Sequence, residues 1–144
     1  MKHKNEIQVY LAVFGENFNP DELTALLQVT PTRTQIKGQE IPPIKGLYQK
    51  PGTKPPVYIE TVWEYGSDYV KTYDSEDASR VVETALKDKV ALINQFVSKH
   101  NLTVQLAVVP WIDKREAPRI HFSPTFVKML SDLNAAIDMD IYVV

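Results

Sequence analysis

The amino-acid sequence predicts a fold of the α+β class: a single two-layer domain with a mostly antiparallel or mixed sheet and helices packed on one face. Three observations favour it. The 144 residues have the length of one domain, spanning 1–144. Segments with the alternating pattern of strands are interspersed with segments of helical periodicity. Two phrases that start helices, at 18–23 and 122–127, each follow a predicted strand.

The two helix-starting phrases are built alike, on the pattern Phe-x-Pro. Asn19 and Ser123 each offer a side-chain oxygen that can cap a helix. Pro20 and Pro124 occupy the first helical position, where the missing N–H of proline is not needed. The repeated strand–helix pattern is compatible with a ferredoxin-like duplication within the domain, although two short matches do not establish one.

The first predicted elements are a strand at 6–15 and a helix at 20–28. The strand is apolar on both faces, which is typical of a strand in the centre of a sheet. Another strand is predicted at 57–65, where apolar and polar residues alternate. Ile59 and Trp63 are in phase along it, so Trp63 is expected in the core.

One long helix is predicted at 75–99, because apolar residues recur there at helical spacing. Asn101 is the expected C-cap. Strands follow at 102–109 and 119–122, separated by a polar turn. The second capped helix then leads to an alternating strand at 137–143.

The segment 31–56 is predicted to be a long basic loop, because it holds six of the ten prolines and three of the five glycines. Its charge is +4, which leaves −6 for the rest of the chain. The charged residues are Arg33, Lys37, Lys45, Lys50, Lys54 and the single acid Glu40.

Composition excludes several classes of function. The chain has no cysteine, so it forms no disulfide or thiolate metal site, as is usual in a reducing cytosol. A net charge of −2 argues against general nucleic-acid binding. No signal peptide and no apolar run of about 20 residues is recognisable, so we expect a cytoplasmic protein without a membrane span.

The histidines do not form a metal-binding pattern. His3, His100 and His121 lack the spacing of ligands, and no His-x-x-Glu pattern accompanies them. We therefore expect no metal and no cofactor.

The sequence contains residue types found in two kinds of catalytic arrangement, but each has a structural alternative. His121, Ser123 and either Asp138 or Asp140 have the residue types of a nucleophilic triad. Ser123 is better used as a helix cap, so no catalytic residue is assigned. Asp138 and Asp140 share one face of the last strand and could act as an acid–base pair. A solvent-exposed face is the favoured interpretation, because a strand with one buried face carries polar residues on the other.

Three groups of residues are candidates for contact with a protein partner. The basic loop could meet an acidic surface, Trp111 could anchor an interface, and acids at the start of the long helix could meet a basic surface. Each group has a structural alternative. The alternatives are that the loop is simply solvated, that Trp111 is buried, and that the acids serve only to interact with the helix dipole. The candidates are Trp111, Arg115, Arg33, Lys37, Asp74, Glu76 and Asp77.

Segments at both ends of the chain resemble the bacterial family named domain of unknown function 4279. They are Phe14-Gly15, 19–23, 31–33, 37–38, 122–124 with Leu130 and Leu133, and 138–143. The family has no settled catalytic residues, so the resemblance assigns none here. It implies kinship with suspected immunity proteins, which neutralise a partner toxin. Gln28-Val29-Thr30 replaces the Leu-Gly ending of the family's first helix, so this helix is expected to end differently.

We therefore expect a non-enzymatic, cytoplasmic protein-binding domain of the immunity type. One alternative is a small-ligand-binding protein or hydrolase-like enzyme, with a pocket near Trp63, Tyr65, His121 and Asp140. Another alternative is a domain that self-associates through a free sheet edge, giving a homo-oligomer.

Overall fold

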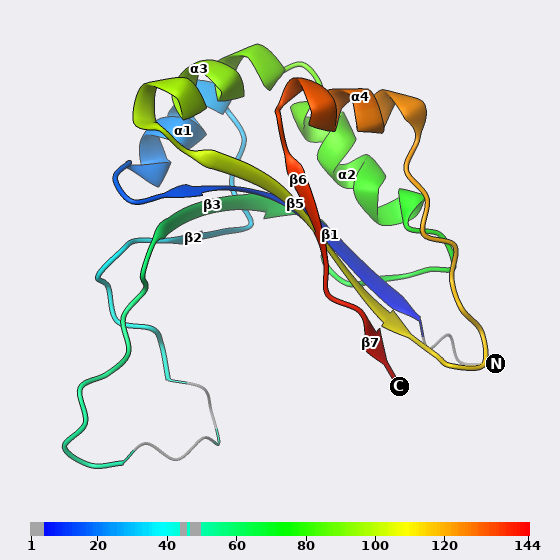
Figure 1. Cartoon of the computed structure of the whole chain (residues 1–144), viewed down its shortest axis with the longest axis horizontal. Helices are drawn as coiled ribbons and strands as arrows, with labels where there is room; N and C mark the ends of the chain where they lie inside the picture. The colour runs from blue at the N-terminus through cyan, green and yellow to red at the C-terminus, as the bar shows by residue number, and fades with distance from the viewer. Residues whose placement is uncertain (1–4, 44–45, 47–49) are drawn as a thin grey trace.

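The computed structural model of the chain describes residues 5–43, 46 and 50–144. These residues form one mixed sheet of seven strands and four helices, which confirms the α+β class. All four helices lie on one side of the sheet (Figure 1). His3 and Lys45 lie outside the described residues.

The centre of the sheet is a long antiparallel pair, β1 (Glu6–Gly15) with β5 (Thr103–Ile112). The strand order is β2-β3-β1-β5-β6, with β4 beside β1 and β7 beside β5. Both β6 and β7 run parallel to β5, whereas the other pairings are antiparallel. The remaining strands are β2 (Arg33–Gln35), β3 (Thr61–Gly66), β4 (Val70–Lys71), β6 (Ala136–Met139) and β7 (Tyr142–Val143).

The helices are α1 (Pro20–Leu27), α2 (Glu76–Leu86), α3 (Val90–His100) and α4 (Pro124–Asp132). Both predicted N-caps are confirmed. The Asn19 side chain accepts a hydrogen bond from the backbone N–H of Asp21 at 2.9 Å, and Ser123 accepts one from Phe126 at 3.2 Å. In the described part of the chain, no helix combines the length and apolarity needed to cross a bilayer.

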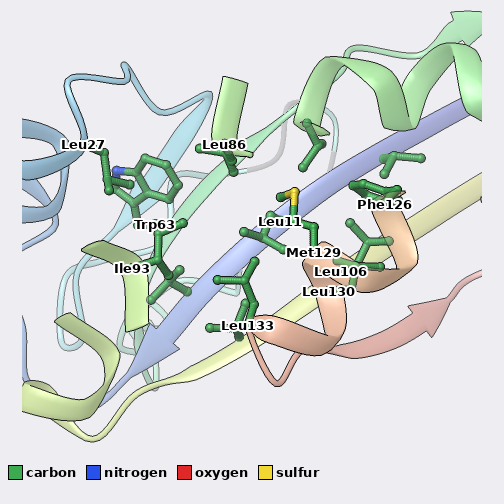
Figure 2. Packing of buried hydrophobic residues seen from close by; sticks show 14 of the residues in the cluster. Leu11, Leu27, Trp63, Leu86, Ile93, Leu106, Phe126, Met129, Leu130 and Leu133 are labelled. Carbon is green, nitrogen blue, oxygen red and sulfur yellow. The ribbon is translucent and has the colours of Figure 1, made fainter. Parts of the chain in front are cut away.

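The core lies between the sheet and the helices (Figure 2). Apolar residues of β1 and β5 face leucines of α1 and α2 and the aromatic and sulfur side chains of α4. Trp63 is fully buried, as predicted, and its indole N–H donates to the Thr24 hydroxyl at 3.0 Å. The largest fully buried side chains include Trp63, Phe126, Ile7, Leu11, Leu23, Leu27, Leu86, Ile93 and Leu106.

The prediction of one long helix at 75–99 is wrong, because α2 ends at Leu86 and α3 begins at Val90. A straight helix of that length would extend about 37 Å, and the break at Lys87–Lys89 lets the two parts follow different directions over the sheet (Figure 1). Asn101 does cap α3, in the left-handed conformation with φ 54°.

The predicted turn after residue 109 begins later than expected, since β5 continues through Pro110 and Trp111. Pro110 lies opposite Ile7 of β1. On its other side, the parallel pairing stops after Met139 and resumes at Tyr142. Because proline lacks an N–H, the strand accommodates it where the outer ladder is interrupted.

The predicted strand at 57–65 begins only at Thr61. Residues 36–43 and 50–60, which we call the arm, follow β2 and precede β3, and they extend away from the sheet (Figure 1). Backbone hydrogen bonds join its two sides, including Gly38 N–H to Tyr58 O at 2.9 Å and Ile41 N–H to Pro56 O at 2.9 Å. Ile59 is 83% exposed and does not share the core with Trp63.

The second Phe-x-Pro phrase is not preceded by a strand. Around 119–122 the described structure has only an isolated bridge, between Asp74 and Arg119. A ferredoxin-like arrangement is nevertheless present in 6–112. It has two units of strand, helix and strand: β1 and β2 joined by α1, and β3 and β5 joined by α2 and α3. Their strands lie in the order β2-β3-β1-β5, and all neighbouring pairs are antiparallel. The second unit is thus not the segment that carries the second Phe-x-Pro phrase.

Candidate functional site

The sheet face opposite the helices is the most distinctive surface of the molecule, and we call it the open face. Strand register identifies its side chains, because directly paired residues point to the same side. Tyr10 pairs with Gly66 and with Ala107, and Ala107 in turn pairs with Asp138. These positions alternate with the buried, helix-facing residues of the same strands. The open face includes Arg33, Glu64, Tyr10, Asp138, Asp140, Trp111 and Tyr142.

An ion pair occupies the β2–β3 end of the open face. The Arg33 Nε atom donates to both carboxylate oxygens of Glu64 at 3.1 Å, and its Nη2 atom lies 3.1 Å from Oε2. The Glu64 side chain is only 8% exposed, whereas that of Arg33 is 50% exposed. Burial alone would lower the pKa of Arg33, but the hydrogen bond and charge of Glu64 raise it. Arg33 is therefore engaged within the chain rather than free for a partner.

Tyr10 lies at the centre of the open face, between the small residues Gly66 of β3 and Ala107 of β5. Burial raises the pKa of its phenol above the ordinary value of 10.0, and the negative charge of Glu64 raises it further. A Cβ atom at Gly66 would collide with the Tyr10 side chain and with the Val9 carbonyl oxygen. Glycine at this position is thus required for the close approach of β3 to β1.

An aromatic stack lies on the part of the open face formed by the end of β5 and by β7. The rings of Trp111 and Tyr142 lie 4.6 Å apart between centroids, with an interplanar angle of 17°. Trp111 is 37% exposed, so it is neither a buried lid nor a free side chain. Asp138 and Asp140 are exposed on neighbouring positions of the same face, as their alternation predicted. This end of the face therefore combines aromatic area with negative charge.

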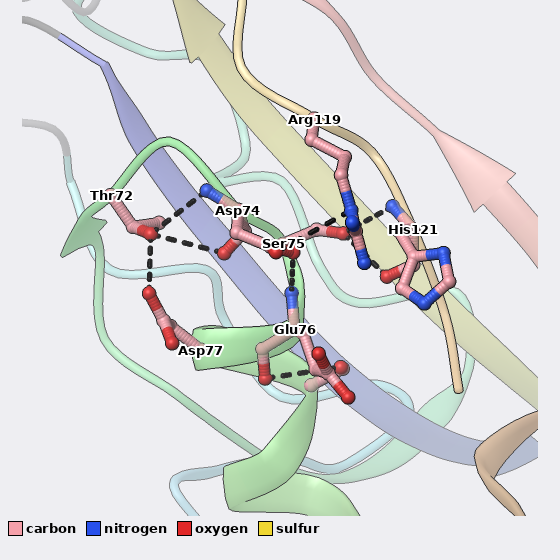
Figure 3. Close-up of polar contacts among 8 residues, drawn as sticks. Thr72, Asp74, Ser75, Glu76, Asp77, Arg119 and His121 are labelled. Carbon is pink, nitrogen blue, oxygen red and sulfur yellow. Dashed lines mark hydrogen bonds and ion pairs between the residues drawn. The ribbon is translucent and has the colours of Figure 1, made fainter.

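The predicted acidic contact residues belong to a local network that joins α2 to the segment before α4 (Figure 3). Asp74 accepts from the N–H of Glu76 at 2.9 Å and pairs with Arg119 at 3.5 Å. Asp77 accepts from the Thr72 hydroxyl at 2.6 Å. Asp74 and Asp77 thus serve the start of α2, which was the structural alternative for these acids.

His121, predicted as a possible site residue, is part of the same network through its backbone. The buried Ser75 hydroxyl donates to the His121 carbonyl and accepts from the His121 N–H, both at 2.7 Å. Ser123 is occupied as the cap of α4. The triad of His121, Ser123 and an aspartate is therefore not assembled, because Asp138 and Asp140 belong to the open face.

The remaining basic candidates are also paired. Arg115 binds the buried Asp113 through Nε at 3.2 Å and Nη2 at 3.1 Å, and these bonds raise the pKa of Arg115. Lys37 lies 3.9 Å from Glu16, a distance that leaves its ammonium group largely solvated. Of the basic candidates, Lys37 is the one most available to a partner.

The alternative pocket near Trp63, Tyr65, His121 and Asp140 does not form. Trp63 is buried under the helices, and Tyr65 lines a hollow of about 400 Å³ against α2. Asp140 belongs to the open face, on the other side of the sheet.

A larger hollow of about 450 Å³ lies between α2 and α4. Its polar groups bind one another, since Thr125 donates to Glu83 at 2.8 Å and Lys128 pairs with Asp132 at 3.3 Å. Within the described residues, no group of three or more His, Cys, Asp or Glu could hold a metal ion.

Sequence reasoning missed Tyr10, Glu64 and Tyr142. Tyr10 was recognisable only as part of a strand apolar on both faces. The partners of Glu64 and Tyr142 depend on strand register, which no local pattern indicates.

Comparison with known proteins places the chain in a family. A family model described as "Domain of unknown function (DUF4279)" matches residues 5–144, so the chain belongs to this family. No curated protein matches the chain. No solved structure matches it either.

Proposed function

We propose that the chain is a non-enzymatic protein-binding domain that contacts its partner through the open face. The observation that carries this proposal is the partly exposed stack of Trp111 and Tyr142 on a sheet face without helices. Tryptophan and tyrosine are the residues most often found at interface hot spots, because they bring large apolar area together with a polar group.

Charge on the same face favours a basic partner. Asp138 and Asp140 are exposed next to the aromatic stack, whereas the charge of Arg33 is already balanced by Glu64. Complementary charge speeds the encounter of two proteins and selects against partners of the same sign. The domain therefore suits a partner whose contact surface carries lysine or arginine.

Within this function, we propose the role of an immunity protein in the cytoplasm. The resemblance to a family suspected to include immunity proteins supports this role. Such a protein acts by covering the surface of a toxin, and many toxin enzymes that bind nucleic acid are basic. An acidic, aromatic contact surface fits that task without a cofactor.

A pull-down from the native host, followed by mass spectrometry, tests partner binding. The wild-type protein and the Trp111→Ala and Val127→Ala variants serve as baits, since Val127 is exposed on α4, away from the open face. We expect a partner that is retained by Val127→Ala and lost from Trp111→Ala. Equal recovery on all three baits would contradict the assignment of the open face.

Co-expression tests the immunity role separately. The captured partner is expressed in a bacterial host with the wild-type protein or with Trp111→Ala. We expect the partner to be toxic, the wild-type protein to restore growth, and the variant to restore it poorly. A partner that binds but does not impair growth would leave the binding function intact and remove the immunity role.

Self-association is a second candidate, because β6 and β7 form an outer edge with exposed apolar residues. Sedimentation measurements across a range of concentrations test it. A constant monomer mass would exclude it under those conditions.

A further inference from the structure

The outer strands β6 and β7 leave one edge of the sheet with free backbone groups. The N–H of Asp140 donates to Val108 O at 3.0 Å, and that of Val144 donates to Ile112 O at 2.9 Å. Even-numbered residues of this segment thus turn their backbone groups toward β5. Because these groups alternate along a strand, the odd-numbered residues turn theirs away from the sheet. They are Ile137, Met139, Ile141 and Val143.

The side chains of these odd-numbered residues form an apolar row on the helix side of the edge. Ile137 pairs with Leu106 and Met139 with Val108, whose side chains face the core. The four side chains in the row are between 43% and 64% exposed. Lysine and proline, which commonly protect free edges, are absent from 136–143. The edge therefore combines free hydrogen-bonding groups with uncovered apolar area.

The opposite side of the same edge is acidic. Asp138 and Asp140 project from the open face next to the stacked Tyr142. Two copies joined along this edge by a two-fold axis would bring Asp138 and Asp140 of one copy beside the same carboxylates of the other. Like charges in facing positions of neighbouring strands are destabilising, whereas opposite charges are stabilising. The charge thus favours a partner strand with basic residues over a second copy.

We propose that the β6–β7 edge binds an extended segment of a partner protein as an additional strand. The segment alternates apolar and basic residues: its basic side chains lie beside Asp138 and Asp140, and its apolar side chains cover Ile137, Met139 and Ile141. Backbone hydrogen bonds supply affinity in this mode of binding, and the alternating side chains supply specificity. The inference rests on the proposed protein-binding function and specifies the chemistry of the partner.

Two synthetic heptapeptides test the edge directly, one alternating valine with lysine and the other alternating valine with glutamate. Binding is followed through the backbone amide NMR signals of 136–143 and by calorimetry. We expect the lysine peptide to shift the signals of Met139 and Ile141 and to bind about tenfold more tightly than the glutamate peptide. The double variant Asp138→Lys/Asp140→Lys should reverse this preference. Equal binding of both peptides, or no binding of either, would overturn the proposal.

A proline variant separates strand addition from simple charge attraction. Met139→Pro removes an outward N–H, which an edge strand tolerates, and Met139→Ala is the matched control that keeps it. We expect Met139→Pro to lose the lysine peptide and Met139→Ala to retain it. Unchanged binding by Met139→Pro would overturn the proposal. If this variant does not fold, the charge-reversed double variant decides the outcome alone.

Two further results would distinguish this inference from the broader function. A natural partner that binds Met139→Pro and the charge-reversed variant normally, but not Trp111→Ala, would overturn the edge proposal and leave the protein-binding function standing. Concentration-dependent dimerisation that Met139→Pro abolishes would replace the basic partner with a second copy.

Discussion

Removing Arg33 should destabilise the protein more than removing its partner Glu64. Breaking a fully buried ion pair costs about 3–5 kcal/mol, because the remaining charge keeps no counter-charge. The Glu64 side chain is 8% exposed and that of Arg33 is 50% exposed, so water reaches only one of the two. We therefore expect Arg33→Met to lower the free energy of unfolding by about 2 kcal/mol, since partial hydration offsets the rest.

Replacing Glu64 instead leaves the positive charge of Arg33, which can turn toward solvent. We expect Glu64→Gln to cost no more than about 1 kcal/mol, because the amide keeps the volume and one acceptor of the carboxylate. The double variant should recover most of the loss caused by Arg33→Met. Urea denaturation at pH 7 of all four proteins measures the cycle. An Arg33→Met cost equal to or smaller than that of Glu64→Gln would refute the reasoning.

Three further predictions concern stability. Gln28→Gly should stabilise the protein by about 0.5–1 kcal/mol in urea denaturation, because Gln28 ends α1 at φ 56°. The matched control Asn101→Gly should gain less, since asparagine tolerates this conformation. Ser75→Ala should cost about 2 kcal/mol in the same assay, because the backbone groups of His121 lose their buried partner; a neutral result would contradict this. Tyr10→Phe should reduce the loss of stability in alkali, because the phenol of Tyr10 has a raised pKa in the folded protein. The stability that this shift contributes is complete below the ordinary pKa of 10.0 and is lost as pH rises through the raised pKa of the folded state. Parallel loss in both proteins would argue against it.

Features that depend on neighbouring residues were predictable from the sequence. The caps at Asn19 and Ser123 are local, so the starts of α1 and α4 were correct to the residue. The central position of β1 followed from its two apolar faces. The αL residue Gln28 confirms that α1 ends without the glycine expected of its family.

Features that depend on tertiary packing were not predictable. The apolar periodicity continues from α2 into α3, so it does not reveal the break at Lys87–Lys89. Near the end of β5, the ring of Trp111 stacks on Tyr142, which lies 31 residues farther along the chain. Arg33 was singled out as a contact residue, but its ion pair with Glu64 depends on the register of β2 and β3, which the sequence does not reveal.

The pairing of β1 with β5 has a consequence for how the molecule is made. It joins 6–14 to 103–111, so the middle of the sheet cannot form until all the intervening residues have been synthesised. Contacts between such distant positions slow folding, because a long loop must be ordered first. During translation, the apolar faces of β1 remain uncovered while β5 has not yet been synthesised. The nascent chain is therefore prone to aggregation until β5 has been synthesised and paired with β1.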